Sequence, residues 1–217
     1  MLVGHKQQWE FLKQALGNNR LPQAFIFSGE ERLGKKKTAF EFVKMVFCEN
    51  PKEAPCQVCQ SCILVEKASH PDFIFIAPQK REIKIDQVRD LQKEISLKPV
   101  LSKMKIAVIN DAHCLNAQAQ NCILKTLEEP KSQTIFILIS PLPAVLISTI
   151  QSRCETIKFY PSKNKNISLE FQNSLKTAKE FLTKDLFYKL LFIKELFPKN
   201  KEDNDDERRE TNKKKEE

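Results

Sequence analysis

The chain has 217 residues, of which 41% are hydrophobic, and its formal net charge is +8. No apolar run approaches the roughly 20 residues needed to span a membrane, and the length suits one large domain or one domain with a small appendage. The first residues lack the basic region and apolar block of a secretory signal, so we expect a cytosolic protein with no membrane partner. The basic charge is compatible with nucleic acid nearby but does not require it.

Short β-rich runs alternate with helical patterns through residues 5–160. The runs are Ala24–Ser28, Phe73–Ala77, Lys105–Asn110, Ile135–Ser140 and Glu155–Phe159. Most are almost wholly apolar, as expected for parallel strands that are covered on both faces. Apolar residues recur at helical spacing between the runs, and a further helix is expected at Asn116–Glu129, ended by Pro130. The alternation predicts an α/β fold with a parallel five-stranded sheet flanked by helices.

The pattern changes after Tyr160-Pro161. Residues 161–198 are expected to form a short helical segment. The segment 199–217 is nearly all charged or polar, which predicts a disordered tail. The main domain is therefore expected at residues 1–160.

A phosphate-binding loop is indicated directly after the first expected strand. The segment reads Gly29-Glu30-Glu31-Arg32-Leu33-Gly34-Lys35-Lys36 and precedes a helix, which is the G-x-x-x-x-G-K pattern in its strand–turn–helix setting. Gly29 and Gly34 let backbone N–H groups turn toward a phosphate, and Lys35 can reach the outer phosphates. ATPases carry Ser or Thr at the next position as a Mg²⁺ ligand, but here it is Lys36. A lysine-rich loop that merely opens a helix is the alternative interpretation.

A second motif is expected where the third strand ends. P-loop ATPases place an acidic pair there, one acid for Mg²⁺ and one that orients the attacking water. This chain has the neutral amide Asn110 at the first position and the short acid Asp111 at the second. With Lys36, these residues predict a degenerate nucleotide site. Binding of ATP or ADP without turnover is left open.

Four cysteines lie within fifteen residues at Cys48, Cys56, Cys59 and Cys62. Four thiolates can close a tetrahedral structural zinc site with no open position for chemistry, so this loop predicts bound Zn²⁺. A redox pair or unrelated thiols are the alternatives. Cys122 lies on an expected apolar helix face and is predicted to be a core residue.

An arginine, Arg153, follows the fourth strand within Ser152-Arg153-Cys154. A rigidly placed guanidinium near a sheet edge can stabilise charge on a phosphate of a neighbouring subunit. An ordinary surface salt bridge is the alternative, and the residues alone favour it.

Taken in order, these motifs resemble the clamp-loader branch of the AAA+ ATPases, and most of all its bacterial delta prime family. The resemblance covers about residues 5–160. It rests on the phosphate loop, the cysteine loop, His70-Pro71-Asp72, the segment Ile83–Leu91, the segment Asn121–Pro130 and Ser152-Arg153-Cys154.

The resemblance implies a cytoplasmic, nucleoid-associated replication subunit within the DNA polymerase III holoenzyme. Its expected partners are the gamma/tau and delta clamp-loader subunits and, through the complex, the sliding clamp and primer–template DNA. It further implies that Arg153 acts in trans on a neighbour's ATP, that the chain's own ATPase is absent, and that Ser140 occupies a nucleotide-sensing position. The family continues with a helical lid and a helical collar. Residues 161–198 are too short for both, so a truncated lid or collar is expected.

Two other functions fit parts of the sequence. A gamma/tau-like ATPase motor shares the cysteine loop but requires an intact phosphate loop and acidic pair. A zinc-containing nucleic-acid binder unrelated to clamp loading would bind DNA by itself, with salt-sensitive affinity.

Overall fold

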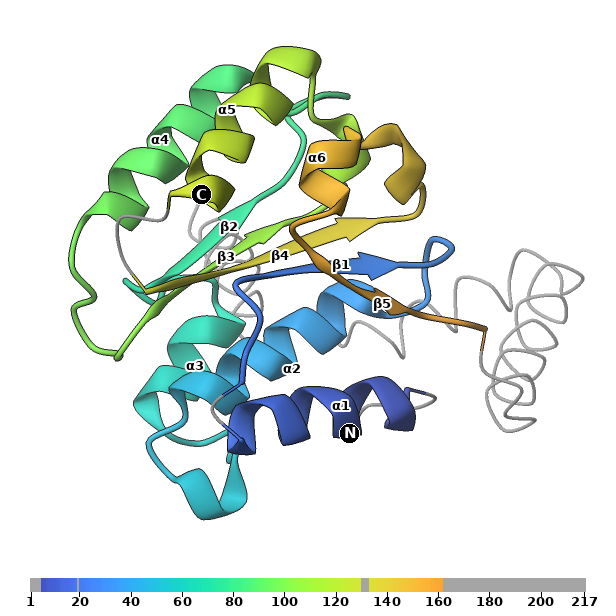
Figure 1. Ribbon diagram of the computed structural model, residues 1–217. Coiled ribbons are helices and arrows are strands. Elements are labelled where there is room, and N and C mark those ends of the chain that lie inside the picture. The colour runs from blue at the N-terminus through green and yellow to red at the C-terminus, as the bar shows by residue number, and fades with distance from the viewer. Residues whose placement is uncertain (1–4, 19, 130–132, 162–217) are drawn as a thin grey trace, which may run out of the picture. The chain divides into compact units, whose positions relative to one another are not determined.

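A computed structural model describes residues 5–18, 20–129 and 133–161 of the chain (Figure 1). Apart from Pro161, the predicted helical segment at 161–198 and the charged tail at 199–217 lie outside these residues, as does Pro130. Within the described residues, no helix is both long enough and apolar enough to cross a bilayer.

Five parallel strands form one sheet in the order β2-β3-β4-β1-β5. The strands are β1 Ala24–Ser28, β2 Phe73–Ile76, β3 Lys105–Ile109, β4 Thr134–Ser140 and β5 Glu155–Lys158. The predicted five-stranded parallel sheet is confirmed, with ends that differ from the expected ones by at most one residue. Because all strands run the same way, the loops that follow them meet at one edge of the sheet.

Helices cover both faces of the sheet. Figure 1 shows α4, α5 and α6 over one face and α1, α2 and α3 over the other. The helices are α1 Lys6–Gly17, α2 Lys35–Phe47, α3 Gln60–Glu66, α4 Ile85–Ser96, α5 Ala117–Glu128 and α6 Ser148–Gln151, with short 3₁₀ turns at Pro51–Glu53, Ala112–Cys114 and Pro143–Val145.

The two-residue period of the strands divides their side chains between two cores. Phe25 and Phe27 pack with the cluster under α1 and α2, whereas Ala24 and Ile26 pack with the cluster under α4 and α5. Burial on both faces explains why β1, β3 and β4 are mostly apolar, with polar residues only at their ends. Cys122, expected in the core, is only partly buried and packs against the second of these clusters.

The His70-Pro71-Asp72 segment holds a loop that is distant in the sequence. The carboxylate of Asp72, which is fully buried, accepts the backbone N–H groups of Val100, Leu101 and Ser102 at 2.7, 2.8 and 2.7 Å. Burial alone would raise the pKa of Asp72, but these three donors outweigh it and lower the pKa below its ordinary value. A single carboxylate therefore anchors the segment that leads into β3.

Candidate functional site

The phosphate loop lies between the end of β1 and the start of α2. Gly34 is the N-cap of α2 with φ +81°, a left-handed conformation that glycine adopts without strain. Gly29 has φ +145°, and a Cβ added there would lie 2.4 Å from the carbonyl oxygen of Phe159. Glycine is therefore required at Gly29 by the close approach of the backbone after β5.

Lys35 begins α2, and its side chain turns back over the loop. Its ammonium donates to the carbonyl oxygens of Gly29 and Glu30, and the residue is only 6% exposed. Burial lowers the pKa of Lys35, while the nearby charges of Asp111 and Glu31 oppose that shift. The loop thus places a desolvated cation beside the acid that follows β3.

Lys36 extends along an aromatic wall. Its Nζ lies 4.6 Å from the ring centre of Phe75 and 5.6 Å from that of Phe40. These distances are typical of cation–π contacts. Thr38, the nearest hydroxyl, donates to the carbonyl of Gly34 at 3.2 Å and is fully buried, so it does not replace the missing metal ligand.

The two residues expected after β3 pair with each other. The amide of Asn110 donates to the carboxylate of Asp111 at 2.7 Å, and Asp111 adopts a left-handed conformation with φ +52°. An ammonium group has no lone pair for a metal, and the amide carries no charge. The side chains at Lys36 and Asn110 therefore do not fit the Mg²⁺ ion that this fold ordinarily holds.

A cleft of about 1100 Å³ opens at the carboxyl edge of the sheet. Its walls come from the phosphate loop, the first turns of α2, the end of α3 and the loops after β2, β3 and β4. Lys35, Lys36, Asn110 and Asp111 line this cleft as expected. The hydroxyl of Ser140 is fully buried and accepts the N–H of Leu142, and among the described residues it is the neighbours Ile139 and Pro141 that line the cleft instead.

Sequence reasoning missed three cations that reach this cleft from outside the phosphate loop and α2. Lys67 follows α3, and Lys80 and Arg81 lie in the loop after β2. The parallel order of the strands was the available signal, because loops that follow neighbouring parallel strands share an edge.

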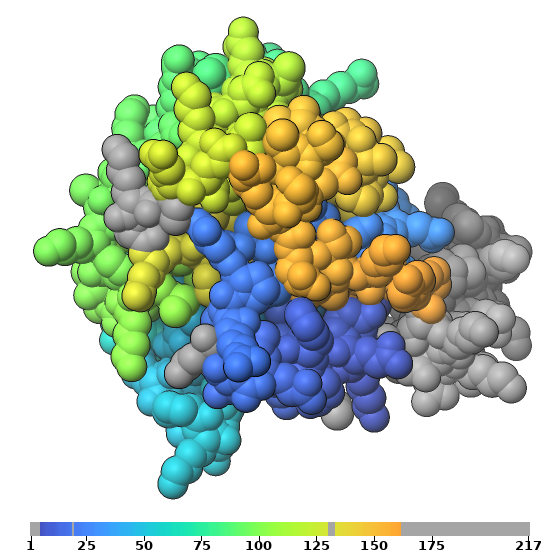
Figure 2. Space-filling view, in the orientation of Figure 1, coloured from blue at the N-terminus to red at the C-terminus, as the bar shows by residue number. Residues whose placement is uncertain are grey.

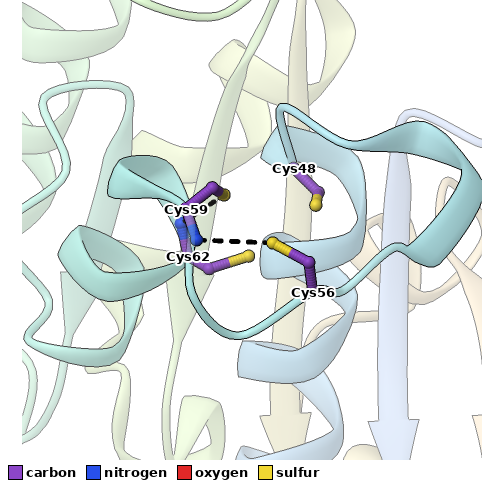
Figure 3. Close-up of side chains that lie close together, drawn as sticks. All are labelled: Cys48, Cys56, Cys59 and Cys62. Carbon is purple, nitrogen blue, oxygen red and sulfur yellow. Dashed lines mark hydrogen bonds between the residues drawn. The ribbon is translucent and has the colours of Figure 1, made fainter.

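The four cysteines meet between the end of α2 and the start of α3 (Figure 3). Their four Sγ atoms lie within 4.8 Å of one another. Tetrahedral Zn–S bonds of about 2.3 Å require sulfur separations of about 3.8 Å, so the cluster fits a Zn²⁺ ion. Two of the sulfurs also accept backbone N–H groups at 3.4 Å, Cys56 from Cys59 and Cys59 from Cys62.

The environments of these thiols differ. The backbone N–H groups of Val58 and Cys59 lower the pKa of Cys56 to about 7. Burial raises the pKa of Cys62 to about 12. A divalent ion bound by Cys48, Cys56, Cys59 and Cys62 would supply the positive charge that stabilises a buried thiolate. With four cysteine ligands, such a site would be closed and structural, because no coordination position would remain for a substrate.

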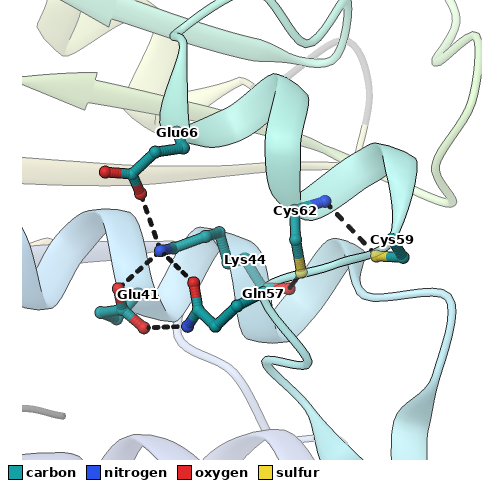
Figure 4. A network of polar contacts seen from close by, with 6 residues as sticks. All are labelled: Glu41, Lys44, Gln57, Cys59, Cys62 and Glu66. Carbon is teal, nitrogen blue, oxygen red and sulfur yellow. Dashed lines mark hydrogen bonds and ion pairs between the residues drawn. The ribbon is translucent and has the colours of Figure 1, made fainter.

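A buried ammonium ties the cysteine loop to the two helices beside it (Figure 4). Lys44 on α2 is 2% exposed, and its Nζ contacts Glu41 at 2.6 Å, Gln57 at 2.7 Å and Glu66 at 2.8 Å. Burial alone would lower the pKa of Lys44, but the hydrogen bonds that its ammonium donates to Glu41 and Glu66 outweigh burial and raise the pKa. No local pattern in the sequence predicted this network.

Arg153 lies on the surface in the turn between α6 and β5. Its guanidinium contacts Glu128 at 2.8 Å and the carbonyl of Thr149 at 3.1 Å, and the Arg153 side chain is 40% exposed. Figure 2 shows the α6–β5 segment, in orange, on the surface of this side of the domain.

The strand register separates Arg153 from the phosphate loop. Glu155 pairs with Phe25 near the start of β1, and Lys158 pairs with Ser28 at its end. Arg153 therefore precedes the amino end of this strand pair, whereas Gly29 follows the carboxyl end.

Comparison with known proteins identifies the family. Residues 4–163 match the family described as "DNA polymerase III, delta subunit". The chain belongs to this family. A delta prime subunit of DNA polymerase III from Bacillus subtilis is 35% identical over 158 residues, which are 73% of this chain and 48% of the relative. A tau subunit from the same organism is 34% identical over 159 residues, 73% of this chain and 28% of the relative.

The predicted resemblance to delta prime clamp-loader subunits is thus confirmed, although the chain spans less than half the length of these two relatives. The fold is also that of a solved DNA polymerase III gamma subunit-related protein from Thermotoga maritima. That structure has a TM-score of 0.56 and 22% identity, over 72% of this chain and 47% of the other. This DNA polymerase III family member therefore carries the expected AAA+ type P-loop fold.

Proposed function

We propose that the chain acts as a delta prime-like clamp-loader subunit in DNA replication, within the cytoplasmic replisome. In this role it assembles with gamma/tau and delta subunits and, through them, helps to load a sliding clamp on primer–template DNA. It does not turn over ATP itself but supplies Arg153 to the ATP of a neighbouring subunit. The Zn²⁺ ion held by its four cysteines is structural.

The position of Arg153 carries this proposal. The guanidinium is exposed and lies at the opposite end of the β1–β5 pair from the chain's own phosphate loop. It is therefore suited to a phosphate on another subunit rather than to its own. Its present partner, Glu128, is 41% exposed, and exposed ion pairs contribute only about 0–1 kcal/mol, so the arginine can exchange Glu128 for a phosphate at little cost.

The substitutions at the metal positions support the lack of turnover. Lys36 puts an ammonium group where a hydroxyl ligand is expected, and Asn110 puts a neutral amide, hydrogen-bonded to Asp111, where an acidic ligand is expected. The tau relative gives some weight to a gamma/tau-like motor function, since its identity is close to that of the delta prime relative. A motor function predicts that the isolated chain hydrolyses ATP in a magnesium-dependent reaction.

The test is reconstitution of the full chain with gamma/tau and delta subunits, measuring clamp- and DNA-dependent ATP turnover. Arg153→Ala should leave folding and assembly intact. ATP turnover at the neighbouring site that receives the arginine should fall roughly 10³-fold or more. The total ATP turnover of the assembly should therefore fall by the fraction that this site contributes. Arg153→Lys should not restore it, because lysine lacks the planar fork.

Arg89→Ala is the matched control. Arg89 is another exposed arginine in an ion pair, with Asp86 at 3.4 Å, but it lies on α4. Unchanged turnover with Arg153→Ala would remove the proposed role. ATP hydrolysis by the isolated chain that disappears in Lys35→Ala would favour the motor function instead.

A further inference from the structure

The cleft at the carboxyl edge of the sheet is lined by more positive charge than the loop motif predicts. Seven cationic side chains line it, contributed by the phosphate loop, by α2, by the end of α3 and by the loop after β2. They are Arg32, Lys35, Lys36, Lys37, Lys67, Lys80 and Arg81. None of the seven takes part in any of the salt bridges found within residues 5–18, 20–129 and 133–161.

Most of the acidic groups in the same cleft are already engaged. Four carboxylates line it, those of Glu31, Glu41, Glu66 and Asp111. Glu41 and Glu66 both bind the buried ammonium of Lys44, and Asp111 accepts the amide of Asn110. The cleft therefore has a surplus of free positive charge, which favours a polyanion.

Lys36 is positioned to contribute to that polyanion site. It occupies the second position of α2, beside the helix N-terminus and its free N–H groups, and it lies against Phe75 and Phe40 in the wall of the cleft. A divalent cation placed beside Lys35 and Lys36 would meet repulsion from both. The protein thus has a fixed charge near the position where related sites bind a metal ion.

We propose that this cleft binds a polyphosphate chain in its magnesium-free form, with Lys36 supplying positive charge that Mg²⁺ supplies in intact P-loop sites. The ligand class is a linear triphosphate, either a nucleoside triphosphate or inorganic tripolyphosphate. The cleft volume of about 1100 Å³ is large enough for either. The proposal concerns the chain's own cleft and does not depend on the role of Arg153.

The test is calorimetric titration of the full chain with ATP and, separately, with inorganic tripolyphosphate. Each titration is run in EDTA and in excess MgCl₂ at matched ionic strength. Affinity should be at least about tenfold higher in EDTA, the size of one charge-assisted contact. Tighter binding of ATP than of tripolyphosphate would identify a nucleoside triphosphate as the ligand, whereas equal affinities would identify the phosphate chain alone.

Two variants at one position separate charge from metal binding. Lys36→Met keeps an aliphatic side chain against Phe75 and should lose about tenfold in EDTA without gaining in MgCl₂. Lys36→Thr restores a hydroxyl and should shift the preference toward the magnesium complex. Lys93→Thr is the matched control, since Lys93 is an exposed lysine on α4 outside the cleft, and it should match the wild type.

Three results would overturn the proposal. They are ATP binding that requires magnesium in the wild type, no binding of either triphosphate, and displacement by a single-stranded oligonucleotide with equal affinity per phosphate. None of these results bears on ATP turnover in the reconstituted assembly. The role of Arg153 is therefore tested independently of this proposal.

Discussion

The cysteine loop and the phosphate loop lie at the two ends of α2, and they differ in what they retain. The cysteine loop brings together all four thiols that a tetrahedral Zn²⁺ site would need, with Sγ atoms within 4.8 Å of one another and the buried Lys44 beside them. The phosphate loop keeps its backbone, fixed by Gly29 and Gly34, but has other side chains at the metal positions. The comparison indicates that packing can fix the backbone of the phosphate loop independently of which side chains it carries.

The largest expected effect comes from breaking the complete site. Cys62→Ser should abolish tight zinc binding and lower the free energy of unfolding by about 5 kcal/mol or more, because metal-binding energy is folding energy in such loops. The midpoint of thermal unfolding should fall by about 10–20 °C. Metal analysis and calorimetry of freshly reduced protein measure both.

Cys122→Ser is the control for loss of a thiol elsewhere. Cys122 lies on α5 and its thiol contacts Gln92 at 3.3 Å. It should keep about one zinc ion per chain and most of its stability. Freshly purified wild type without zinc, or equal losses in the two variants, would contradict a complete metal site at the cysteine loop.

A smaller but substantial loss of stability is expected at the phosphate loop, where the substitution changes only the fit of the backbone. Gly29→Ala should cost about 3 kcal/mol, because the added Cβ would meet the carbonyl of Phe159 at 2.4 Å in a conformation that only glycine adopts easily. Chemical denaturation measures this loss. Gly17→Ala is the opposite control: nothing lies within 4 Å of the added Cβ at the end of α1, so it should be neutral or slightly stabilising. Equal stability of the two variants would show that packing does not hold the phosphate loop.

The smallest of these effects tests how much a carboxylate, without any metal, stabilises the loop at Val100, Leu101 and Ser102. Asp72→Asn should cost about 2 kcal/mol, since the buried carboxylate that accepts three backbone N–H groups becomes a neutral amide. Asp86→Asn on the exposed face of α4 is the control and should cost well under 1 kcal/mol.

The pH dependence of Asp72→Asn follows from the direction of its pKa shift. The pKa of Asp72 is lower in the folded protein than the unfolded value of about 3.9. Its contribution to stability is therefore fully present above about pH 4 and is lost as the pH falls through the folded pKa. Unfolding measured from pH 7 to pH 2 should show wild type and variant converging in acid, and parallel curves would contradict the assignment.

Local sequence patterns were sufficient for the sheet and for both loops. Short β-rich runs, most of them almost wholly apolar, predicted all five strands. Glycine spacing predicted the turn between β1 and α2, and cysteine spacing predicted four thiols that lie close together. The one-residue differences at Ala77, Asn110 and Phe159 arise because each follows the last paired residue of its strand.

Contacts between distant residues could not be predicted in the same way. Lys36 rests on Phe75, which is 39 positions away, and Asp72 binds N–H groups 28 to 30 positions away. Such contacts depend on how elements pack across the sheet, which residue spacing within one element does not specify. The same holds for Lys80 and Arg81 in the cleft wall, which belong to a loop without a recognisable motif.

The helix α2 sets the distance between the phosphate loop and the cysteine loop. It spans 13 residues, about 20 Å, from the phosphate loop at Gly34 to the first thiol of the cysteine cluster at Cys48. Lys36 near one end lies against Phe75 and Phe40, whereas Cys48 at the other end lies with the three other cysteines of its loop. At that separation, a side chain exchanged at one end of the helix makes no direct contact with the side chains at the other end.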